Sequence, residues 1–302
     1  MWSALIVPWT KTDQLDERRW RREVRAYAGT GVHGVYTGGT TGEFYAQDDA
    51  TYERVAAIAC EEAHTAGLPV QIGASALSTR TVIGRMKAVR LYRPDAFQIA
   101  LPFWLELKDE EVRRFVHAVA DAANGTPIVL YLTGRSKRKI DAKFMGRLAR
   151  EVPAFIGTKD TGLDVPGLKA ILKAAPDLAI FGGEDFLTRM PAGGRGGYCS
   201  VTGFNAAKVV ELYQLCAAGK WDEAKPLADA IHNFLYGALV PMVKKPGLWD
   251  SAIDRIQRVA GGGDVGLRCQ SPYKSGTEAD VKRVIAWCRK NTPELLPPHL
   301  VR

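Results

Sequence analysis

The alternation of short apolar runs with amphipathic stretches of helical length is the feature that most limits how this chain can fold. Such an alternation is typical of βα units arranged around a parallel sheet. The apolar runs predict strands at residues 4–8, 34–36, 69–73, 96–101, 127–132, 154–158, 178–181 and 197–201. The amphipathic stretches predict helices at residues 17–28, 48–65, 79–91, 109–123, 141–150, 165–174, 184–190 and 206–218. This succession favours a closed (β/α)8 TIM barrel, and an open, doubly wound sheet is the structural alternative.

The last part of the chain has no further strand pattern. Past Gly219, helices are predicted near residues 221–239, 249–259 and 277–290, separated by proline and glycine breaks. We therefore expect a barrel over residues 1–220 and a C-terminal helical extension over residues 221–302. A chain of 302 residues is long enough for this plan, because a barrel needs about 250 residues.

Composition points to a soluble globular protein, with 46% hydrophobic and 25% charged residues. No stretch approaches the roughly 18 apolar residues that span a bilayer, and residues 1–8 lack the basic start of a secretory signal. The five cysteines are scattered and odd in number, which favours free thiols in the cytoplasm. The histidines never have HExxH spacing, so we predict no metal site.

The formal net charge of +8 could attract nucleic acid or anionic metabolites. The basic residues are spread along amphipathic segments such as residues 18–25, where a solvated helix face is the ordinary explanation. The sequence contains no zinc finger, RNP-like aromatic run or bZIP pattern. We expect neither a nucleic-acid nor a membrane partner, and a nucleic-acid module stays as a competing hypothesis.

A glycine- and threonine-rich turn follows the second predicted strand and precedes a helix. It consists of Gly38-Gly39-Thr40-Thr41-Gly42-Glu43. Glycines allow a tight turn with accessible N–H groups, and threonine hydroxyls add donors, a combination suited to holding a carboxylate. The turn lacks the Gly-Lys-Ser/Thr ending of a nucleotide-binding P-loop. Turns of this composition are also common as purely structural elements.

Tyr131 and Lys159 stand at the ends of the fifth and sixth predicted strands. They are 28 residues apart, which is one βα repeat. Because catalytic groups of a parallel barrel lie at the C-terminal ends of the strands, we expect both side chains to converge at one mouth. Taken singly, a lysine after a strand is usually a solvated charge, and a tyrosine there is usually a packing residue.

Together these segments resemble the dihydrodipicolinate synthase and N-acetylneuraminate lyase superfamily of class I, Schiff-base aldolases. The resemblance extends from Ala4-Leu5-Ile6-Val7-Pro8-Trp9 through the glycine- and threonine-rich turn to two later segments. These segments are Ile156-Gly157-Thr158-Lys159-Asp160-Thr161-Gly162 and Gly196-Gly197-Tyr198-Cys199-Ser200-Val201. The conjunction is more specific than any one motif.

The resemblance implies a role for each matching residue. Lys159 would form the imine, Tyr131 would move protons, and Thr40 and Thr41 would hold the substrate carboxylate beside Gly39. It also implies that the backbone carbonyl of Cys199 faces the bound keto acid and that Gly183 lies near the pocket wall.

The implied enzyme is a lyase or synthase acting on pyruvate or another 2-oxo acid. A lysine in a dry barrel mouth has its ammonium form disfavoured, so its neutral amine can attack a 2-oxo carbon. The protonated imine is an electron sink that permits aldol cleavage, condensation or dehydration. No metal or organic cofactor is required, and the resemblance implies a homodimer or homotetramer.

Two departures from the family pattern affect the second substrate. Synthases that make dihydrodipicolinate carry Tyr-Asn-x-Pro-x-Arg, whereas this chain has Tyr131-Leu132-Thr133-Gly134-Arg135-Ser136. By register, Ser136 replaces the arginine that would bind the second carboxylate, and Arg135 or Lys137 could substitute for it. Trp104 lies where those synthases have a tyrosine pair, and an indole N–H cannot accept a proton in a relay. We expect another 2-oxo acid or a sugar-acid derivative, with Trp104 and Arg135 contacting it.

Several other hypotheses remain at this point. The chain could be an inactive or ligand-binding barrel of the same family, because fold does not fix function. It could also be a true 4-hydroxy-tetrahydrodipicolinate synthase. A sugar-phosphate aldolase would need a phosphate site after strands seven and eight, where Gly182-Gly183 and residues 193–197 offer glycines.

Overall fold

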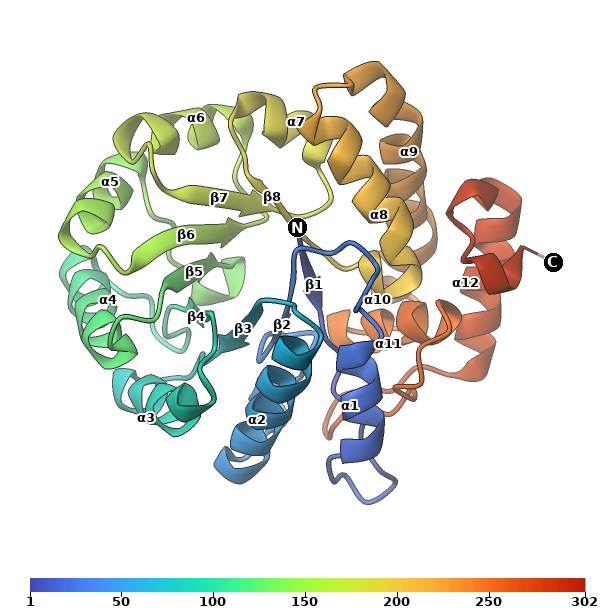
Figure 1. Cartoon of the computed structure of the whole chain (residues 1–302), viewed down its shortest axis with the longest axis horizontal. Coiled ribbons are helices and arrows are strands. Elements are labelled where there is room, and N and C mark those ends of the chain that lie inside the picture. The colour runs from blue at the N-terminus through green and yellow to red at the C-terminus, as the bar shows by residue number, and fades with distance from the viewer. Residues whose placement is uncertain (302) are drawn as a thin grey trace.

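A computed structural model, which describes residues 1–301, has a closed barrel of parallel strands surrounded by helices (Figure 1). Each strand pairs with the next along the chain, and the eighth pairs with the first. The strands are β1 (Trp2–Ala4), β2 (Gly34–Thr37), β3 (Val70–Gly73), β4 (Ala96–Ala100), β5 (Ile128–Leu132), β6 (Phe155–Asp160), β7 (Ala179–Gly182) and β8 (Gly196–Cys199). The predicted TIM barrel is confirmed, and the open sheet is wrong.

Helices form an outer ring around the barrel, as Figure 1 shows. They are α1 (Glu17–Arg25), α2 (Asp49–Thr65), α3 (Thr79–Val89), α4 (Asp109–Ala123), α5 (Ala142–Glu151), α6 (Val165–Ala174), α7 (Phe186–Arg189) and α8 (Thr202–Ala217). Short polar side chains cap several of these helices. Asp48, Ser78 and Asp141 each accept a hydrogen bond from a backbone N–H of the first turn, which stabilises the helix start.

The first strand is displaced from its predicted position at residues 4–8. It covers Trp2–Ala4, and the next residues leave the barrel wall after the Leu5 N–H donates to the Tyr36 carbonyl oxygen at 2.9 Å. Leu5 and Val7 are nevertheless fully buried in the core. A buried apolar loop therefore has the same hydrophobic pattern as a strand.

Four helices follow the barrel helices along the chain. They are α9 (Trp221–Phe234), α10 (Pro241–Lys244), α11 (Asp250–Ala260) and α12 (Glu278–Asn291). A π-helical segment at Leu235–Leu239 separates α9 from α10, so the helix predicted over residues 221–239 ends early. The C-terminal helical region is as expected, and its boundary at residue 220 stays a prediction. Among the described residues no helix is both long and apolar enough to cross a membrane.

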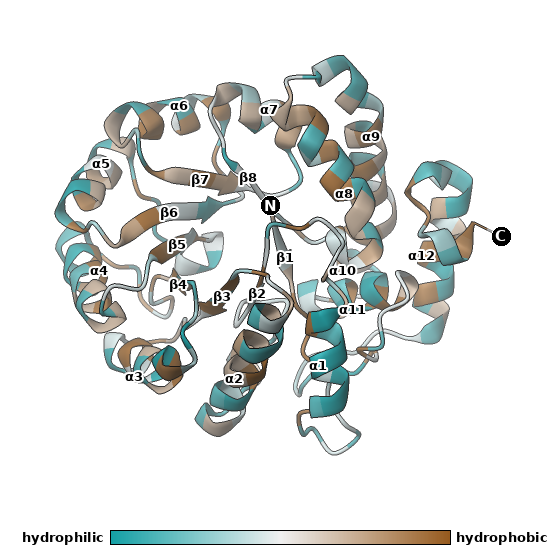
Figure 2. Cartoon of the chain, viewed as in Figure 1, coloured by the Kyte–Doolittle hydropathy of each residue, from teal (hydrophilic) through white to brown (hydrophobic). Residues whose placement is uncertain are grey.

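Side chains fill the molecule in two layers. Val35, Ile72 and Phe97 point outward from the strands and are fully buried beneath the helices. Figure 2 shows the corresponding pattern, with hydrophobic colour on β3 and β5 and mixed colours around the helices. The alternate strand residues point into the barrel, where Tyr36 and Tyr198 pack edge to face with ring centres 5.1 Å apart.

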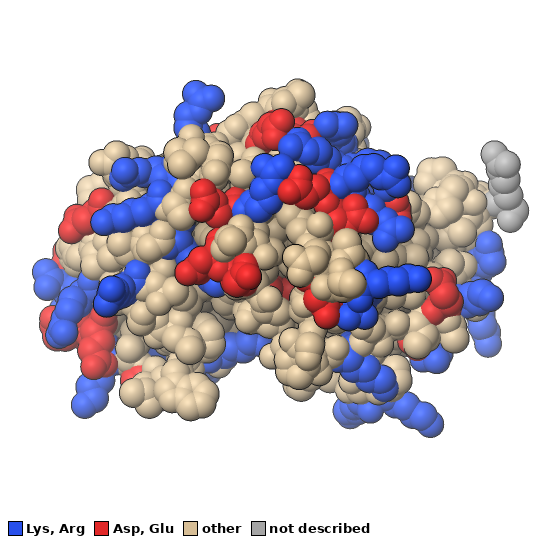
Figure 3. All heavy atoms as spheres, turned by 90° about the horizontal axis from the view of Figure 1, so that it is seen from below, with Lys and Arg blue, Asp and Glu red and all other residues tan. Residues whose placement is uncertain are grey.

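Four basic residues of α1 have acidic partners, namely Arg19, Arg21, Arg22 and Arg25. Arg21 lies 2.9 Å from Glu61, and Arg22 lies 2.5 Å from Asp264. Figure 3 shows Lys and Arg interspersed with Asp and Glu over the face that it draws. This pairing agrees with the interpretation of residues 18–25 as a solvated helix face.

Candidate active site

Lys159 lies near the C-terminal end of β6, with its side chain inside the barrel and only 8% exposed. It is in register with Tyr131 of β5. Its Nζ lies 4.4, 4.9 and 5.0 Å from the ring centres of Tyr131, Tyr36 and Tyr198. Nζ also donates a hydrogen bond of 3.0 Å to the Tyr36 hydroxyl. The amine is thus enclosed by three phenols.

Burial lowers the pKa of Lys159, because the ammonium form loses its hydration. Nearby Tyr131, Glu184 and Asp254 act in the opposite direction but do not cancel this effect. Burial also raises the pKa of Tyr36 well above its ordinary range, so its phenol stays protonated. The arrangement therefore increases the neutral fraction of the amine.

The glycine- and threonine-rich turn lies beside Lys159. Thr40 and Thr41 line the same cavity of about 250 Å³ as Lys159 and Tyr131. Gly38 is required at the start of the turn, since its φ is +77° and an added Cβ would lie 2.4 Å from the Gly73 carbonyl oxygen. The turn can therefore approach β3 closely and present both hydroxyls to the cavity.

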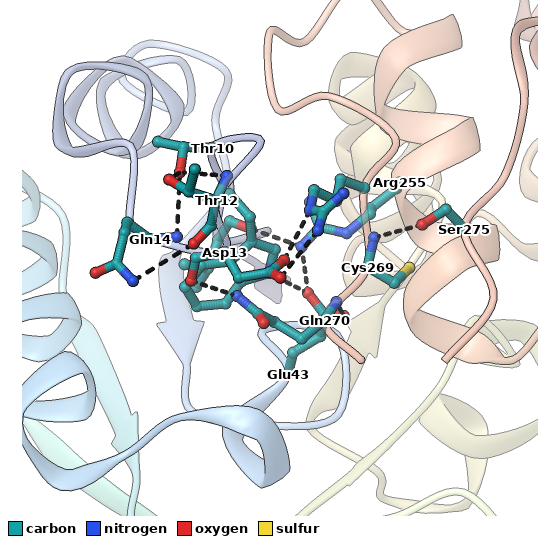
Figure 4. Close-up of polar contacts among 12 residues, drawn as sticks. Thr10, Thr12, Asp13, Gln14, Glu43, Arg255, Cys269, Gln270 and Ser275 are labelled. Atoms are coloured by element: carbon teal, nitrogen blue, oxygen red, sulfur yellow. Dashed lines mark hydrogen bonds and ion pairs between the residues drawn. The ribbon is translucent and has the colours of Figure 1, made fainter. Parts of the chain in front are cut away.

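A buried ion pair fixes this turn to the C-terminal helices. The Glu43 carboxylate pairs with Arg255 of α11 and accepts hydrogen bonds from Trp9 Nε1 at 2.5 Å and the Gln270 N–H at 3.0 Å. Figure 4 shows Glu43 together with its partners Arg255 and Gln270. Arg255 also donates to the Val7 carbonyl oxygen at 2.6 Å. Segments far apart in the sequence thus meet behind the turn.

Asp254 of α11 adds a carboxyl group that the sequence prediction missed. It is 8% exposed and lines the same cavity as Lys159. Its Oδ2 accepts from Thr41 Oγ1 at 2.6 Å, and its Oδ1 accepts from Gln257 Nε2 at 2.9 Å. Burial raises the pKa of Asp254 to about 7. The Asp254 carboxyl group therefore accepts the hydrogen bond of Thr41, one of the donors predicted for the substrate carboxylate.

Glu184 follows β7 and is a second carboxyl group on this cavity. It accepts from the Ser200 N–H at 2.6 Å and from Ser200 Oγ at 2.9 Å. Burial raises the pKa of Glu184. Gly183, which the family resemblance put near the pocket wall, lines the cavity next to it.

A second cavity of about 360 Å³ adjoins the first. Both cavities are lined by Thr40, Tyr131 and Asp250, and the second is also lined by Gly39 and Arg135. Arg135 Nη2 pairs with Asp250 Oδ2 at 2.7 Å. The site thus has a lysine chamber, which contains Lys159, and an outer chamber, and the two share Thr40, Tyr131 and Asp250 in their walls.

A model of the dihydrodipicolinate synthetase family matches residues 1–242 of this barrel. The chain belongs to that family. N-acetylneuraminate lyase of Salmonella paratyphi B is 33% identical over 199 residues, which is 65% of this chain and 66% of that protein. The match thus spans just under two thirds of the relative's length.

Solved structures of the dihydrodipicolinate synthetase family share the fold. N-acetylneuraminate lyase from Fusobacterium nucleatum has a TM-score of 0.82 and 24% identity over 96% of this chain and 98% of that one. A dihydrodipicolinic acid synthase family protein from E. coli K12 in complex with pyruvate has a TM-score of 0.85 and 18% identity over 96% and 97%. The family predicted from the sequence is confirmed, and these relatives are named as lyases or as synthase family proteins.

Trp104 is not where the family register would place a substrate contact. It is 74% exposed and lines neither chamber. The preceding residue, Phe103, faces the outer chamber, so the next side chain in the loop points to solvent. The Trp104 carbonyl oxygen accepts from Lys137 Nζ at 2.8 Å, and this contact holds Lys137 at the loop.

Ser136 is buried and donates to the Thr133 carbonyl oxygen at 2.9 Å. Arg135 is therefore the basic residue of residues 135–137 that lies on the chamber wall.

Cys199 lies outside the chamber lining, although its neighbours Tyr198 and Ser200 belong to it. Strand alternation explains this position, because Tyr198 points into the barrel and the Cys199 side chain points outward into the core. The Cys199 carbonyl oxygen accepts from Thr202 Oγ1 at 2.7 Å. Tyr36 could have been found from the sequence, since it alternates with the apolar Val35 along β2 and so points into the barrel.

Proposed function

We propose that this protein is a Schiff-base lyase or synthase that joins or splits 2-oxo acids through an imine on Lys159, with pyruvate as the simplest substrate. One observation carries the proposal: a buried lysine amine, enclosed by three phenols, opens on the same chamber as two threonine hydroxyls. The names of relatives support it, since one is a lyase and one was solved with pyruvate.

The chemistry follows from the positions of these groups. The neutral Lys159 amine attacks C2 of the 2-oxo acid and water leaves, which gives a protonated imine. Thr40 donates to the substrate carboxylate, and Thr41 donates to it once its hydroxyl turns away from Asp254. A protonated Asp254 can add a third donor there. The imine draws electrons from C3, so a bond between C3 and C4 can break or form. Tyr131 lines both chambers, and its phenol can pass a proton to or from the C4 oxygen.

A true 4-hydroxy-tetrahydrodipicolinate synthase is less well supported. Its second substrate carries a carboxylate that needs a free arginine, whereas Arg135 is already paired with Asp250. The outer chamber also lacks the tyrosine pair of those synthases and has Phe103 instead. Imine formation on Lys159 is therefore better supported than the use of that synthase's second substrate.

Borohydride reduction tests the proposal. The protein is incubated with pyruvate and sodium borohydride and then digested, and the masses of its peptides are measured by mass spectrometry. We expect a reduced pyruvate adduct on Lys159, none in Lys159→Met, and an unchanged adduct in Lys137→Met, which removes an exposed lysine of the loop beside the barrel mouth. A native protein that forms no adduct with any short 2-oxo acid would instead be an inactive or binding barrel.

We infer further that the protein is a cytoplasmic homo-oligomer. All five cysteines are buried and unpaired in the part of the chain that the structure describes, as suits a reducing compartment. Light scattering should give a mass of two or four chains. A mass of one chain would contradict the oligomer.

A further inference from the structure

A series of polar side chains connects the Lys159 amine with a carboxyl group of α11. Nζ donates to the Tyr36 hydroxyl at 3.0 Å. A hydrogen bond with the Thr41 side chain lowers the pKa of this phenol, although burial raises it by more. Thr41 Oγ1 donates to Asp254 Oδ2 at 2.6 Å. All four residues line the lysine chamber, so they form one path along its wall.

The donors along this path all point from the amine toward the carboxyl group. Since the Tyr36 oxygen accepts from Nζ, its own proton is free to point toward Thr41, and the Thr41 proton points toward Asp254. Gln257 Nε2 donates to the other Asp254 oxygen at 2.9 Å, which leaves Oδ2 for Thr41. A hydroxyl that accepts one hydrogen bond and donates another can pass on a proton without holding a charge.

Tyr131 is placed differently from Tyr36 around the amine. Nζ lies over the face of the Tyr131 ring, 4.4 Å from its centre, whereas it lies at hydrogen-bond distance from the Tyr36 hydroxyl. An aromatic face attracts an ammonium group but does not take its proton. Tyr36 is therefore the phenol through which a proton can leave Lys159, and Tyr131 stays available for the substrate.

Burial favours transfer of a proton along this path. Lys159 and Asp254 are each 8% exposed, and burial shifts the pKa of each toward its neutral form. Moving one proton from the ammonium group to the carboxylate removes two buried charges at once. Attraction between the charged forms opposes the transfer, but its effect on Lys159 is smaller than that of burial. The chamber thus favours a transfer that water would oppose.

We propose that Asp254 is the base that takes the proton of Lys159, through the hydroxyls of Tyr36 and Thr41, before the amine attacks a 2-oxo acid. The inference rests on the proposed function, because only a lysine that forms an imine needs a neutral amine. Tyr36 touches the reacting nitrogen, and Asp254 acts on it through the two hydroxyls. Asp254 thus has a role before any contact with the substrate carboxylate.

The transfer balances in atoms and charge. One N–H bond of the ammonium group breaks, its electron pair stays on Nζ, and the proton passes to the Tyr36 oxygen. The Tyr36 proton passes to Thr41 and the Thr41 proton to Asp254 Oδ2, which gives an amine and a carboxylic acid. After the amine has attacked C2, a proton returns along the path to the C2 hydroxyl, which leaves as water. The protonated imine therefore forms without an oxidant, a reductant or a further acid.

The test is the rate of imine formation. The protein is mixed with pyruvate, borohydride is added at timed intervals, and the Lys159 adduct is measured by mass spectrometry. The experiment is run at pH 8, above the pKa of about 7 of Asp254, so that the native carboxyl can accept a proton. At saturating pyruvate we expect Asp254→Asn and Tyr36→Phe each to lower the rate constant by about tenfold or more. Tyr36→Phe should not raise the half-saturating pyruvate concentration, since both threonines remain for the carboxylate.

A purely electrostatic role of Asp254 predicts the opposite result. Its carboxylate raises the pKa of Lys159, so loss of the charge alone would increase the neutral amine and speed imine formation. Glu184→Gln is the matched control, because Glu184 raises the pKa of Lys159 in the same way but accepts from Ser200 rather than from Thr41. This variant should form the imine at least as fast as the native protein.

The double variant with Tyr36→Phe and Asp254→Asn distinguishes one path from two separate effects. Groups in series lose their joint contribution at the first break, so the double variant should be no slower than the slower single variant. If the two losses multiply, or if Asp254→Asn forms the imine as fast as the native protein, the relay is wrong and the imine chemistry survives. If the native protein forms no adduct with any short 2-oxo acid, both proposals fall.

Discussion

Single residues of this site depend on burial for their chemistry. Lys159 is an ordinary lysine whose amine loses hydration among Tyr36, Tyr131 and Tyr198, and Asp254 is an ordinary aspartate buried against Thr41. Burial shifts the pKa of each group in the direction that favours its neutral form. Function at this scale therefore costs stability.

Lys159→Met should raise stability. The unfolded lysine keeps its proton up to its ordinary pKa of 10.5, whereas the native amine releases it at a lower pH, so the lysine destabilises the native state throughout the neutral range. We expect the variant to gain about 1–2 kcal/mol at pH 7 in urea unfolding, with a smaller gain as pH rises toward 10.5. A loss of stability in the variant would contradict the burial argument.

Asp254→Asn should change the pH dependence in the opposite sense. The native carboxyl keeps its proton up to about pH 7, whereas the unfolded one releases it near 3.8, so native stability falls between these values. The asparagine variant lacks this fall of about 4 kcal/mol, and its gain in stability over the native protein should be larger at pH 8 than at pH 4.

The same variant should change the pH dependence of KM. The KM for pyruvate should rise above pH 7 in the native protein, because an ionised Asp254 repels the substrate carboxylate, and should change less with pH in the variant. If the native protein and the variant showed the same pH dependence of stability and of KM, this prediction would be wrong.

At the scale of elements, the turn after β2 depends on α11. Glu43 of the turn and Arg255 of α11 are fully buried, so bulk solvent cannot hydrate either charge if its partner is lost. The Glu43–Arg255 pair fixes the turn that holds Thr40 and Thr41 at the chamber wall. Helices beyond the barrel are therefore part of the candidate site.

Glu43→Gln should therefore destabilise the protein by about 3–5 kcal/mol, because it leaves the Arg255 charge buried without its counter-charge. Glu17→Gln is the matched control, since it breaks a half-exposed pair with Arg54 and should cost less than about 1 kcal/mol. Urea unfolding of the two variants measures the contrast. If both variants lost the same free energy of unfolding, the buried Glu43–Arg255 pair would contribute no more to stability than an exposed pair.

The element pattern was predictable because strands and helices follow local periodicity. The eight strands lie close to their predicted ranges except β1, where Leu5 and Val7 are buried loop residues. The convergence of Lys159, Tyr131, Thr40 and Thr41 on one cavity was predictable because barrel topology brings strand ends together. Asp254 was missed because it lies on α11, and no local pattern shows which barrel residue a late helix will contact. Trp104 was misplaced because a one-residue shift in a loop reverses which side chain faces inward.

At the scale of the whole molecule, closure of the sheet brings β2, β5, β6 and β8 to one mouth, where Tyr36, Tyr131, Lys159 and Tyr198 meet. The C-terminal helices complete this mouth with Asp254. The barrel thus supplies the amine and the phenols, and the later helices add a carboxyl group beside Thr41.

A crystal structure of the protein soaked with pyruvate tests the central claim most directly. The account predicts continuous electron density from Lys159 Nζ to C2 of pyruvate, with the carboxylate within hydrogen-bond distance of Thr40 or Thr41. Pyruvate that is bound without a covalent link, or attached to a lysine outside the barrel, would contradict it.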